Sequence, residues 1–145
     1  METVVKKFHE LSADDLYSIL QLRIDVFVVE QRCAYREADG LDRGALHVFL
    51  RDEKGIAAYL RVMAPGVEGP CASIGRVVSA RRGLGLGKKV LLAGISAAKS
   101  VFGDGPLYLE AQVHAAPFYE KAGFRKISGE FLLDGIPHVK MLRGA

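Results

Sequence analysis

The sequence lacks the features that define several common classes of protein. It has no tryptophan, two cysteines and five prolines among 145 residues. Cys33 and Cys71 form no CxxC pair and have no histidines at zinc-site spacing, which argues against a metal site and favours free thiols in a reducing compartment. No apolar run approaches the roughly 20 residues that span a bilayer, and the first residues lack an apolar stretch of signal-peptide length. We therefore expect a cytoplasmic protein without membrane contact.

Charge of one sign is also scarce. The 20 Lys and Arg residues nearly balance 17 Asp and Glu residues, and the net charge of +3 is too small to indicate a nucleic-acid partner. Basic residues do gather at Arg81, Arg82, Lys88 and Lys89, which suits a phosphorylated ligand. An apolar fraction of 50% in a chain of this length predicts one domain, residues 1–145, around a single core.

The order of strands and helices predicts an α+β fold. Strands are expected at residues 4–8, 45–52, 55–63, 71–79 and 106–113, with a closing hairpin over 124–142. Helices are expected after the N-cap Ser12, after a glycine-rich stretch at 82–87, and from Ala116. This pattern predicts a mixed, mostly antiparallel sheet of about seven strands flanked by three to four helices. The free edge of the closing hairpin is compatible with a homodimer.

Residues 82–87, which read RGLGLG, carry the most informative chemistry. Glycines at alternate positions let the backbone approach a ligand closely. The helix that begins there directs unpaired N–H groups and the positive end of its dipole at the same point. We therefore expect a pyrophosphate-binding loop. The alternative is a tight strand-to-helix connection whose glycines only ease packing.

Two better-known phosphate loops fit this stretch less well. A nucleotide P-loop needs glycine where Arg82 stands and a hydroxyl residue where Lys89 stands. A dinucleotide-binding loop needs GxGxxG early in a βαβ unit, whereas this chain has GxGxG after three mostly antiparallel strands. The first interpretation fails at two positions and the second is disfavoured.

Two stretches together resemble the GNAT superfamily of N-acetyltransferases. Residues 82–87, after the strand 74–78, resemble the Arg/Gln-x-x-Gly-x-Gly/Ala acetyl-CoA motif of that superfamily. Residues 118–124, FYEKAGF, resemble its region where a tyrosine beside the CoA sulfur is the general acid. Further similarity at 22–31, 111–115 and 134–138 is typical of the ElaA-like branch, so the resemblance covers nearly the whole chain. One departure is the connection 79–81, which is shorter than usual in the superfamily.

The resemblance implies an acetyl-CoA-dependent N-acetyltransferase that moves the acetyl group by direct transfer to a small-molecule or peptide amine. Acetyl-CoA would be the co-substrate, and no metal is implied. Direct transfer needs a base for the amine and an acid for the departing thiolate. The resemblance implies Tyr119 as the acid and leaves the base open between Glu30, His138 and Glu110. The implied CoA groove consists of Val77, Val78, Arg81, Arg82, Gly83, Leu84, Gly85, Leu86, Gly87 and Gln112.

The four candidate catalytic residues also have structural interpretations. Tyr119 would then be a helix aromatic that packs on the sheet. Glu110 would form a cross-strand contact, and Glu30 would cap a helix or pair with an arginine. His138 would be a strand histidine with satisfied hydrogen bonds. The motif around Tyr119 favours its catalytic role, whereas the base stays unassigned.

Other polar residues near these motifs are expected to be structural. Arg23 and Arg76 are assigned mainly to anchoring neighbouring carboxylates, with contact to an acidic substrate group as the alternative for Arg76. His114 is assigned to a hydrogen bond in a turn, with membership of the site as its alternative. A fold does not by itself establish an activity, so the alternative function is a CoA-binding, catalytically silent GNAT-fold interaction module. The uninterrupted glycine run and the presence of Tyr119 favour the enzyme.

Overall fold

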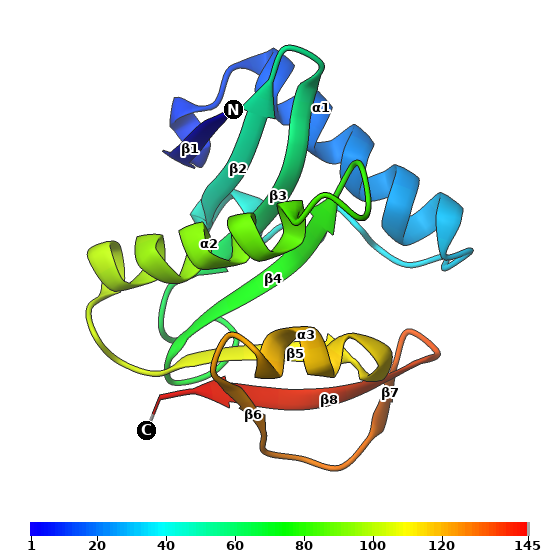
Figure 1. The fold of residues 1–145 in the computed structure, drawn as a ribbon, viewed down its shortest axis with the longest axis vertical. Coiled ribbons are helices and arrows are strands. Elements are labelled where there is room, and N and C mark those ends of the chain that lie inside the picture. The colour runs from blue at the N-terminus through cyan, green and yellow to red at the C-terminus, as the bar shows by residue number, and fades with distance from the viewer. Residues whose placement is uncertain (145) are drawn as a thin grey trace.

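The computed structural model describes residues 1–144 as helices packed on one eight-stranded sheet (Figure 1). The strand order is β1-β2-β3-β4-β5-β8-β6, and β7 also pairs with β8. The strands are β1 (Glu2–Lys7), β2 (Leu46–Asp52), β3 (Gly55–Met63), β4 (Ala72–Ser79), β5 (Leu107–Gln112), β6 (Phe124–Lys126), β7 (Phe131–Leu133) and β8 (Ile136–Arg143). The expected α+β fold with a mostly antiparallel sheet is confirmed, with eight strands instead of about seven.

The additional strand arises because one arm of the closing hairpin is interrupted. Both β6 and β7 pair antiparallel with β8, and residues 127–130 leave the ladder between them. This interruption stays tied to β8, since the backbone N–H of Lys140 donates to Ser128 Oγ at 2.9 Å. At the other end of the sheet, the first strand stops at Lys7 instead of residue 8, because Phe8–Glu10 form a 3-10 turn.

Helices cover both faces of the sheet. α2 (Leu86–Phe102) and α3 (Ala116–Glu120) lie on one face, and α1 (Ala13–Arg23) lies on the other (Figure 1). α1 begins at the predicted cap, where Ser12 Oγ accepts the N–H of Asp15 at 3.0 Å, and it continues into a π-helical stretch, Ile24–Glu30. Within residues 1–144, none of the helices combines the length and the apolar character that a membrane span requires.

Each face of the sheet has its own apolar cluster. On the α2–α3 face, Val90 and Leu91 of α2 belong to the same cluster as Leu60, Leu109 and Met141 of the sheet. On the α1 face, Ile19 packs with Phe49, Tyr59 and Val78. The strands alternate between these clusters, as expected of a sheet buried on both faces.

β4 and β5 separate soon after they meet. Their parallel ladder contains only the pairs Ala72–Leu107 and Ser73–Tyr108. On its other edge β4 carries a β-bulge, where the pairing with β3 shifts and Arg76 adopts a φ of 56°. An extra residue reverses the alternation of side chains. The bulge therefore turns the end of β4 away from β5 and opens a gap inside the sheet.

Candidate active site

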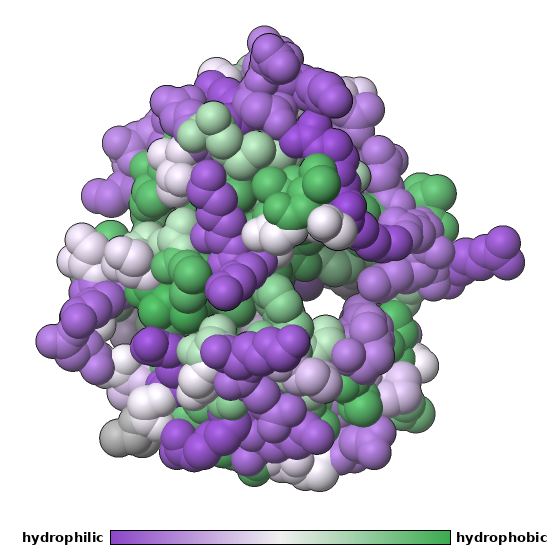
Figure 2. All heavy atoms as spheres, in the orientation of Figure 1, coloured by the Kyte–Doolittle hydropathy of each residue, from purple (hydrophilic) through white to green (hydrophobic). Residues whose placement is uncertain are grey.

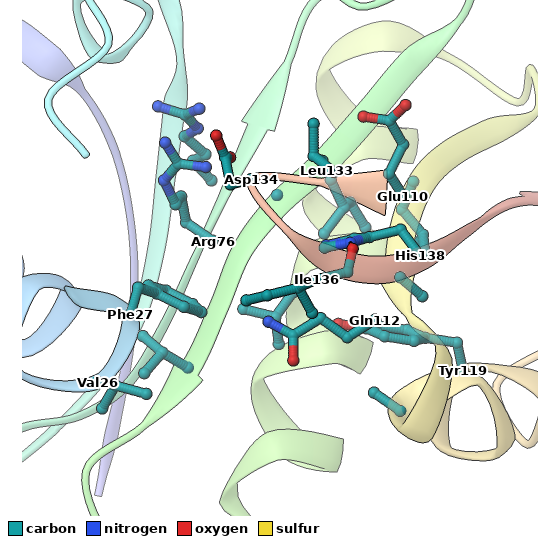
Figure 3. Close-up of a pocket in the computed structure, with 18 of the residues that line it drawn as sticks. Val26, Phe27, Arg76, Glu110, Gln112, Tyr119, Leu133, Asp134, Ile136 and His138 are labelled. Carbon is teal, nitrogen blue, oxygen red and sulfur yellow. The ribbon is translucent and has the colours of Figure 1, made fainter. Parts of the chain in front are cut away.

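A cavity of about 350 Å³ occupies the gap between β4 and β5. Its walls come from both strands, from the π-helical stretch, from α3 and from the β7–β8 turn. Figure 2 shows the surface hollowed between the part of the molecule that carries α2 and the part that carries α3. Figure 3 shows the side chains of both halves converging on this space. The strand that precedes the glycine loop, Arg82 at the start of that loop, and Tyr119 of the second signature stretch therefore line one cavity.

Tyr119 approaches the cavity from the α2–α3 face. It lies on the short helix α3, which has Pro117 in its first turn, and its ring makes edge-on contacts with Phe118 and Phe124 at centroid distances of 5.0 and 6.1 Å. Burial raises the pKa of the Tyr119 phenol above its ordinary value. The hydroxyl therefore stays protonated at neutral pH and is available as a proton donor in the cavity wall.

His138 and Gln112 line the cavity from the α1 face, directly opposite each other on β8 and β5. His138 Nδ1 lies 2.7 Å from the carbonyl oxygen of Ile136. Because a carbonyl only accepts, Nδ1 carries the proton and the neutral ring has an unprotonated Nε2. Gln112 is held by a 3.1 Å contact to the Gln31 side chain from the end of the π-helical stretch. Both side chains are thus fixed by neighbours that also belong to the cavity wall.

Glu110 lies two residues before Gln112 on the same face of β5, and it also lines the cavity. It is exposed, and one of its carboxylate oxygens accepts the hydroxyl proton of Tyr108 at 3.0 Å. His114 is exposed in the turn that follows β5 and borders the same cavity. The Glu110 carboxylate is therefore available to a ligand on this face of the sheet.

The glycine loop has the geometry that a close ligand approach requires. Gly83 and Gly85 have φ values of 79° and 70°, and no atom lies within 4 Å of the position a Cβ would take at either residue. Gly85 is the N-cap of α2, so the first N–H groups of the helix, from Leu86 onward, have no partner within the helix. Leu84 is exposed, whereas Leu86 and Gly87 belong to the first turn of α2. The loop thus presents free backbone donors beside open space.

The basic side chains next to this loop are engaged with carboxylates. Arg81 pairs with Asp52, and Arg82 pairs with Glu30 at 2.5 Å on the surface. Val77, Val78 and Arg82 line the cavity, whereas Glu30, Arg81 and the backbone of 83–87 lie outside its lining. The predicted pairing of Glu30 with an arginine is confirmed.

A buried network of charges lies under the α1 side of the cavity. Arg23 contacts Glu37 and lies 2.7 Å from Asp42, and Arg61 lies 2.6 Å from Asp39. The sixth member, Arg76, contacts Glu37 at 2.9 Å from the bulge in β4. The predicted structural role of Arg23 and Arg76 is confirmed.

Two carboxylates of this network, Asp39 and Asp42, are held ionised. Burial works against ionisation of Asp39, but the hydrogen bonds from Arg61 and the charges of Arg61 and Arg76 outweigh it and lower the pKa of Asp39 to about 2. Burial likewise opposes ionisation of Asp42, and its bonds to Arg23 and Arg61 lower its pKa. No group of three or more potential metal ligands occurs within the part of the chain that the structure describes. The arginines and carboxylates of the network thus compensate one another's charges, and their ion pairs hold the Arg76 side chain at the cavity.

Sequence reasoning missed several members of the cavity wall. Tyr35 stacks under the Arg76 guanidinium at 5.3 Å, and Ser73, Glu68 and Asp134 line the cavity. Two signals in the sequence could have found some of them: strand alternation places Ser73 on the same side of the sheet as its register partner Tyr108, and Asp134 lies in the family-like stretch 134–138. Glu68 and Asp134 lie in turns, where acidic residues are common.

The fold and this cavity define an acyltransferase-like domain, and comparisons with known proteins identify the family. The sequence model of the acetyltransferase (GNAT) domain matches residues 18–143, and the chain belongs to this family. It lies in the ElaA-like branch, since it is 36% identical to Escherichia coli ElaA over 92% of this chain and 90% of that protein. The resemblance drawn from the sequence is confirmed.

Solved structures agree with this assignment. The crystal structure of E. coli ElaA matches with a TM-score of 0.92 at 34% identity and covers 99% of both chains. An acyl-CoA N-acyltransferase from Pseudomonas aeruginosa matches with a TM-score of 0.93 at 38% identity, over 99% of this chain and 100% of that one. A UPF0039 protein of Schizosaccharomyces pombe is 40% identical over 97% of this chain and 95% of its own length.

Proposed function

We propose that this chain is an acetyl-CoA-dependent N-acetyltransferase that transfers the acetyl group directly to an amine. The observation that carries the proposal is the cavity in the split sheet, where Tyr119 approaches from the α2–α3 face and His138 from the α1 face. An acid and a base on opposite sides of one cavity are what transfer between two substrates needs. Membership of the GNAT family supports the same reaction class.

The chain offers a site that fits acetyl-CoA. The free N–H groups at the start of α2, together with open space at Gly83 and Gly85, suit a pyrophosphate. The edge of β4 at Val77 and Val78 faces the cavity and has no strand partner on the β5 side, so its backbone groups are available to an extended pantetheine arm. When bound there, acetyl-CoA would supply an activated thioester.

Tyr119 is proposed as the general acid. Its buried phenol is protonated at neutral pH, and its ring is fixed between Phe118 and Phe124. A fixed donor at the cavity wall can protonate a thiolate as it departs, which lowers the barrier to transfer. Phe118 also lies 3.5 Å from the position of a Cβ at Gly87, which couples α3 to the glycine loop.

His138 is proposed as the general base. The Nδ1–H bond to the Ile136 carbonyl fixes the tautomer, and the unprotonated Nε2 is then able to accept a proton from the incoming amine. Glu30 is a weaker candidate because it pairs with Arg82 outside the cavity lining. Glu110 lines the cavity, but it lies one pleat away from the Gln112–His138 pair. Gln112 would contact the pantetheine arm or the amine.

The first test is calorimetric titration with acetyl-CoA, followed by a thiol-release assay over a panel of amines. Saturable binding with thiol release supports the enzyme. Binding without release from any amine would instead support the catalytically silent module, and absence of binding would refute both. Gly85→Asp should abolish acetyl-CoA binding through added charge, and Asp tolerates the left-handed backbone at φ 70°. Gly85→Asn, which has nearly the same shape and the same tolerance of the left-handed backbone but no charge, is the matched control.

The role of Tyr119 is tested by Tyr119→Phe. We expect kcat to fall about a hundredfold, the usual contribution of a general acid, with acetyl-CoA binding retained. Tyr17→Phe is the control, because Tyr17 is 73% exposed on α1 and lies outside the cavity lining. An unchanged kcat for Tyr119→Phe would remove this residue from the mechanism.

A further inference from the structure

The charges that line the cavity are not balanced. Its basic side chains are Arg61, Arg76 and Arg82, and each of them is already paired with a carboxylate of the chain. They therefore contribute little net positive charge to a ligand.

Three carboxylates in the lining have no such partner. Within residues 1–144, no basic side chain lies at ion-pair distance from Glu68, Glu110 or Asp134. Lys140, which stands opposite Glu110 on β8, instead places its Nζ 5.9 Å above the ring of Phe131. The unpaired charge of the cavity is thus negative, which favours a cationic ligand.

The carboxylates Glu68 and Glu110 belong to one locality. Glu110 accepts a hydrogen bond from the Tyr108 hydroxyl at 3.0 Å, and Glu68 lines the same cavity. Burial, the bond to Glu110 and the charges of both carboxylates raise the pKa of Tyr108, which agrees with this placement. Figure 3 shows Glu110 and Asp134 toward one end of the cavity and Gln112 and Tyr119 toward the other. The negative end is therefore separate from the proposed acid.

A buried and unpartnered hydroxyl in the same wall also indicates a ligand. Ser73 is 2% exposed, and its Oγ has no hydrogen-bond partner among the described residues. Ser73 pairs in register with Tyr108 and so faces the same side of the sheet as Tyr108 and Glu110. Buried polar groups without a partner are rare, and this one is an acceptor for an ammonium N–H.

A second polar atom in this wall lacks a partner as well. Arg61 Nε is buried without an acceptor, although the other nitrogens of its guanidinium bind Asp39 and Asp42. A neutral acceptor such as water satisfies this N–H, because the charge of Arg61 is already compensated. The wall therefore contains two buried polar atoms, Ser73 Oγ and Arg61 Nε, that a bound ligand or water could satisfy, and its arginines carry no uncompensated positive charge.

The spacing along β5 sets where a second cation would lie. Gln112 stands opposite the proposed base His138, and Glu110 is two residues away on the same face. Two residues of a strand span about 7 Å. A short alkyl chain between two nitrogens covers such a distance.

We propose that the acceptor is a diamine or polyamine, with one nitrogen at His138 and Tyr119 and a second, charged nitrogen held by Glu110 in the part of the cavity wall that also carries Glu68 and Ser73. This inference deepens the proposed N-acetyltransferase function and rests on it. It selects among amines: the substrate carries a second positive charge, and amines that carry a carboxylate are excluded.

The experiment compares three amines of the same chain length in the thiol-release assay: putrescine, n-butylamine and γ-aminobutyrate. We expect kcat/KM for putrescine to exceed that for n-butylamine at least about tenfold, which is about 1.4 kcal/mol. We expect γ-aminobutyrate to be the poorest acceptor because its carboxylate meets unpaired carboxylates. Equal kcat/KM values for putrescine and n-butylamine would overturn the proposal.

Glu110→Gln is the test variant, and Glu53→Gln is its control. Both side chains are exposed and both changes remove one negative charge, but Glu53 lies in the β2–β3 turn outside the cavity. We expect Glu110→Gln to raise KM for putrescine about tenfold with kcat nearly unchanged, and to leave n-butylamine unaffected. A fall in kcat for both amines would instead make Glu110 part of the catalytic step and overturn its anchoring role.

Direct binding separates failure of this inference from failure of the proposed function. Putrescine is titrated into the protein in the presence of CoA, and the titration is repeated with Glu110→Gln. Binding that Glu110→Gln weakens, without thiol release from any amine, would support the cation site and refute the acetyltransferase. Thiol release from n-butylamine without detectable putrescine binding would support the enzyme and overturn the diamine assignment.

Discussion

Gly94→Ala is expected to destabilise the protein through a specific contact between α2 and β3. Gly94 is buried in the middle of α2, and a Cβ built there would lie 2.6 and 2.7 Å from the two Cδ atoms of Leu60. Carbon atoms in contact prefer about 3.5–4.0 Å, so the methyl group and the Leu60 side chain must move apart by about 1 Å. Leu60 is 0% exposed, so its side chain can move only against its neighbours in the core.

The expected magnitude follows from two opposing terms. Overpacking of a filled core costs about 1–3 kcal/mol, and the double contact with Leu60 places this case at the upper end. Replacement of glycine by alanine inside a helix gains about 1 kcal/mol. The net loss in the free energy of unfolding is therefore about 2 kcal/mol, or a fall in Tm of about 6 °C for a chain of this size.

The assay is urea unfolding of Gly94→Ala alone and in a Leu60→Ala background. Removing the Cδ atoms relieves the contact, so Gly94→Ala should stabilise the Leu60→Ala protein by about 1 kcal/mol. Ser96→Gly and Ser96→Ala, at an exposed position of α2, measure the helix-propensity term separately. Equal destabilisation by Gly94→Ala in both backgrounds would refute the assigned contact.

Two further predictions concern charge and capping. Because the pKa of Asp39 is lowered in the folded protein from 3.8 to about 2, its contribution to stability is complete above pH 3.8 and is lost as pH falls toward 2. Asp39→Asn should remove up to about 2 kcal/mol of pH dependence in this window, measured by urea unfolding at several pH values, and an unchanged slope would contradict it. Ser12→Ala should cost about 1 kcal/mol in thermal unfolding, because the cap of α1 is lost, whereas the exposed Ser100→Ala should have little effect.

The strands and helices were predictable wherever local chemistry decides them. The hairpin at 45–63 follows from β-rich flanks around a glycine turn, and the structure places β2 and β3 within one residue of the expected bounds. The start of α1 follows from the capping box of Ser12 and Asp15. In each case the determining residues lie within a few positions of one another in the sequence.

The split between β4 and β5 could not be predicted, because distant residues stabilise it. Residues 72–79 have the composition of an uninterrupted strand, yet Arg76 adopts a φ of 56°, which few non-glycine residues tolerate. Glu37 and Asp39, from an irregular segment before β2, bind the Arg76 guanidinium and compensate this strain. Nothing local distinguishes these carboxylates from solvated surface residues.

The candidate site was predictable only in part, because distant residues also decide which side chains face the cavity. Family motifs led to Tyr119, Gln112 and His138, and the cavity brings these residues together. Glu30 matched an equivalent pattern, but its position is set by the π-helical stretch and by Arg82, and it lies outside the lining. A motif thus identifies which residues are near a site, whereas the backbone path decides which of them face it.

The split sheet also predicts that the binding of the two proposed substrates can be separated experimentally. The glycine loop and Tyr119 belong to the α2–α3 face, whereas Glu110, Gln112 and His138 lie on the α1 face. A ligand on one face meets a ligand on the other only through the gap between β4 and β5. Substitutions at Gly85 should therefore act on acetyl-CoA binding without changing the preference among amines, and substitutions at Glu110 should do the reverse. A variant at Glu110 that weakened acetyl-CoA binding as strongly as amine binding would contradict this two-sided arrangement.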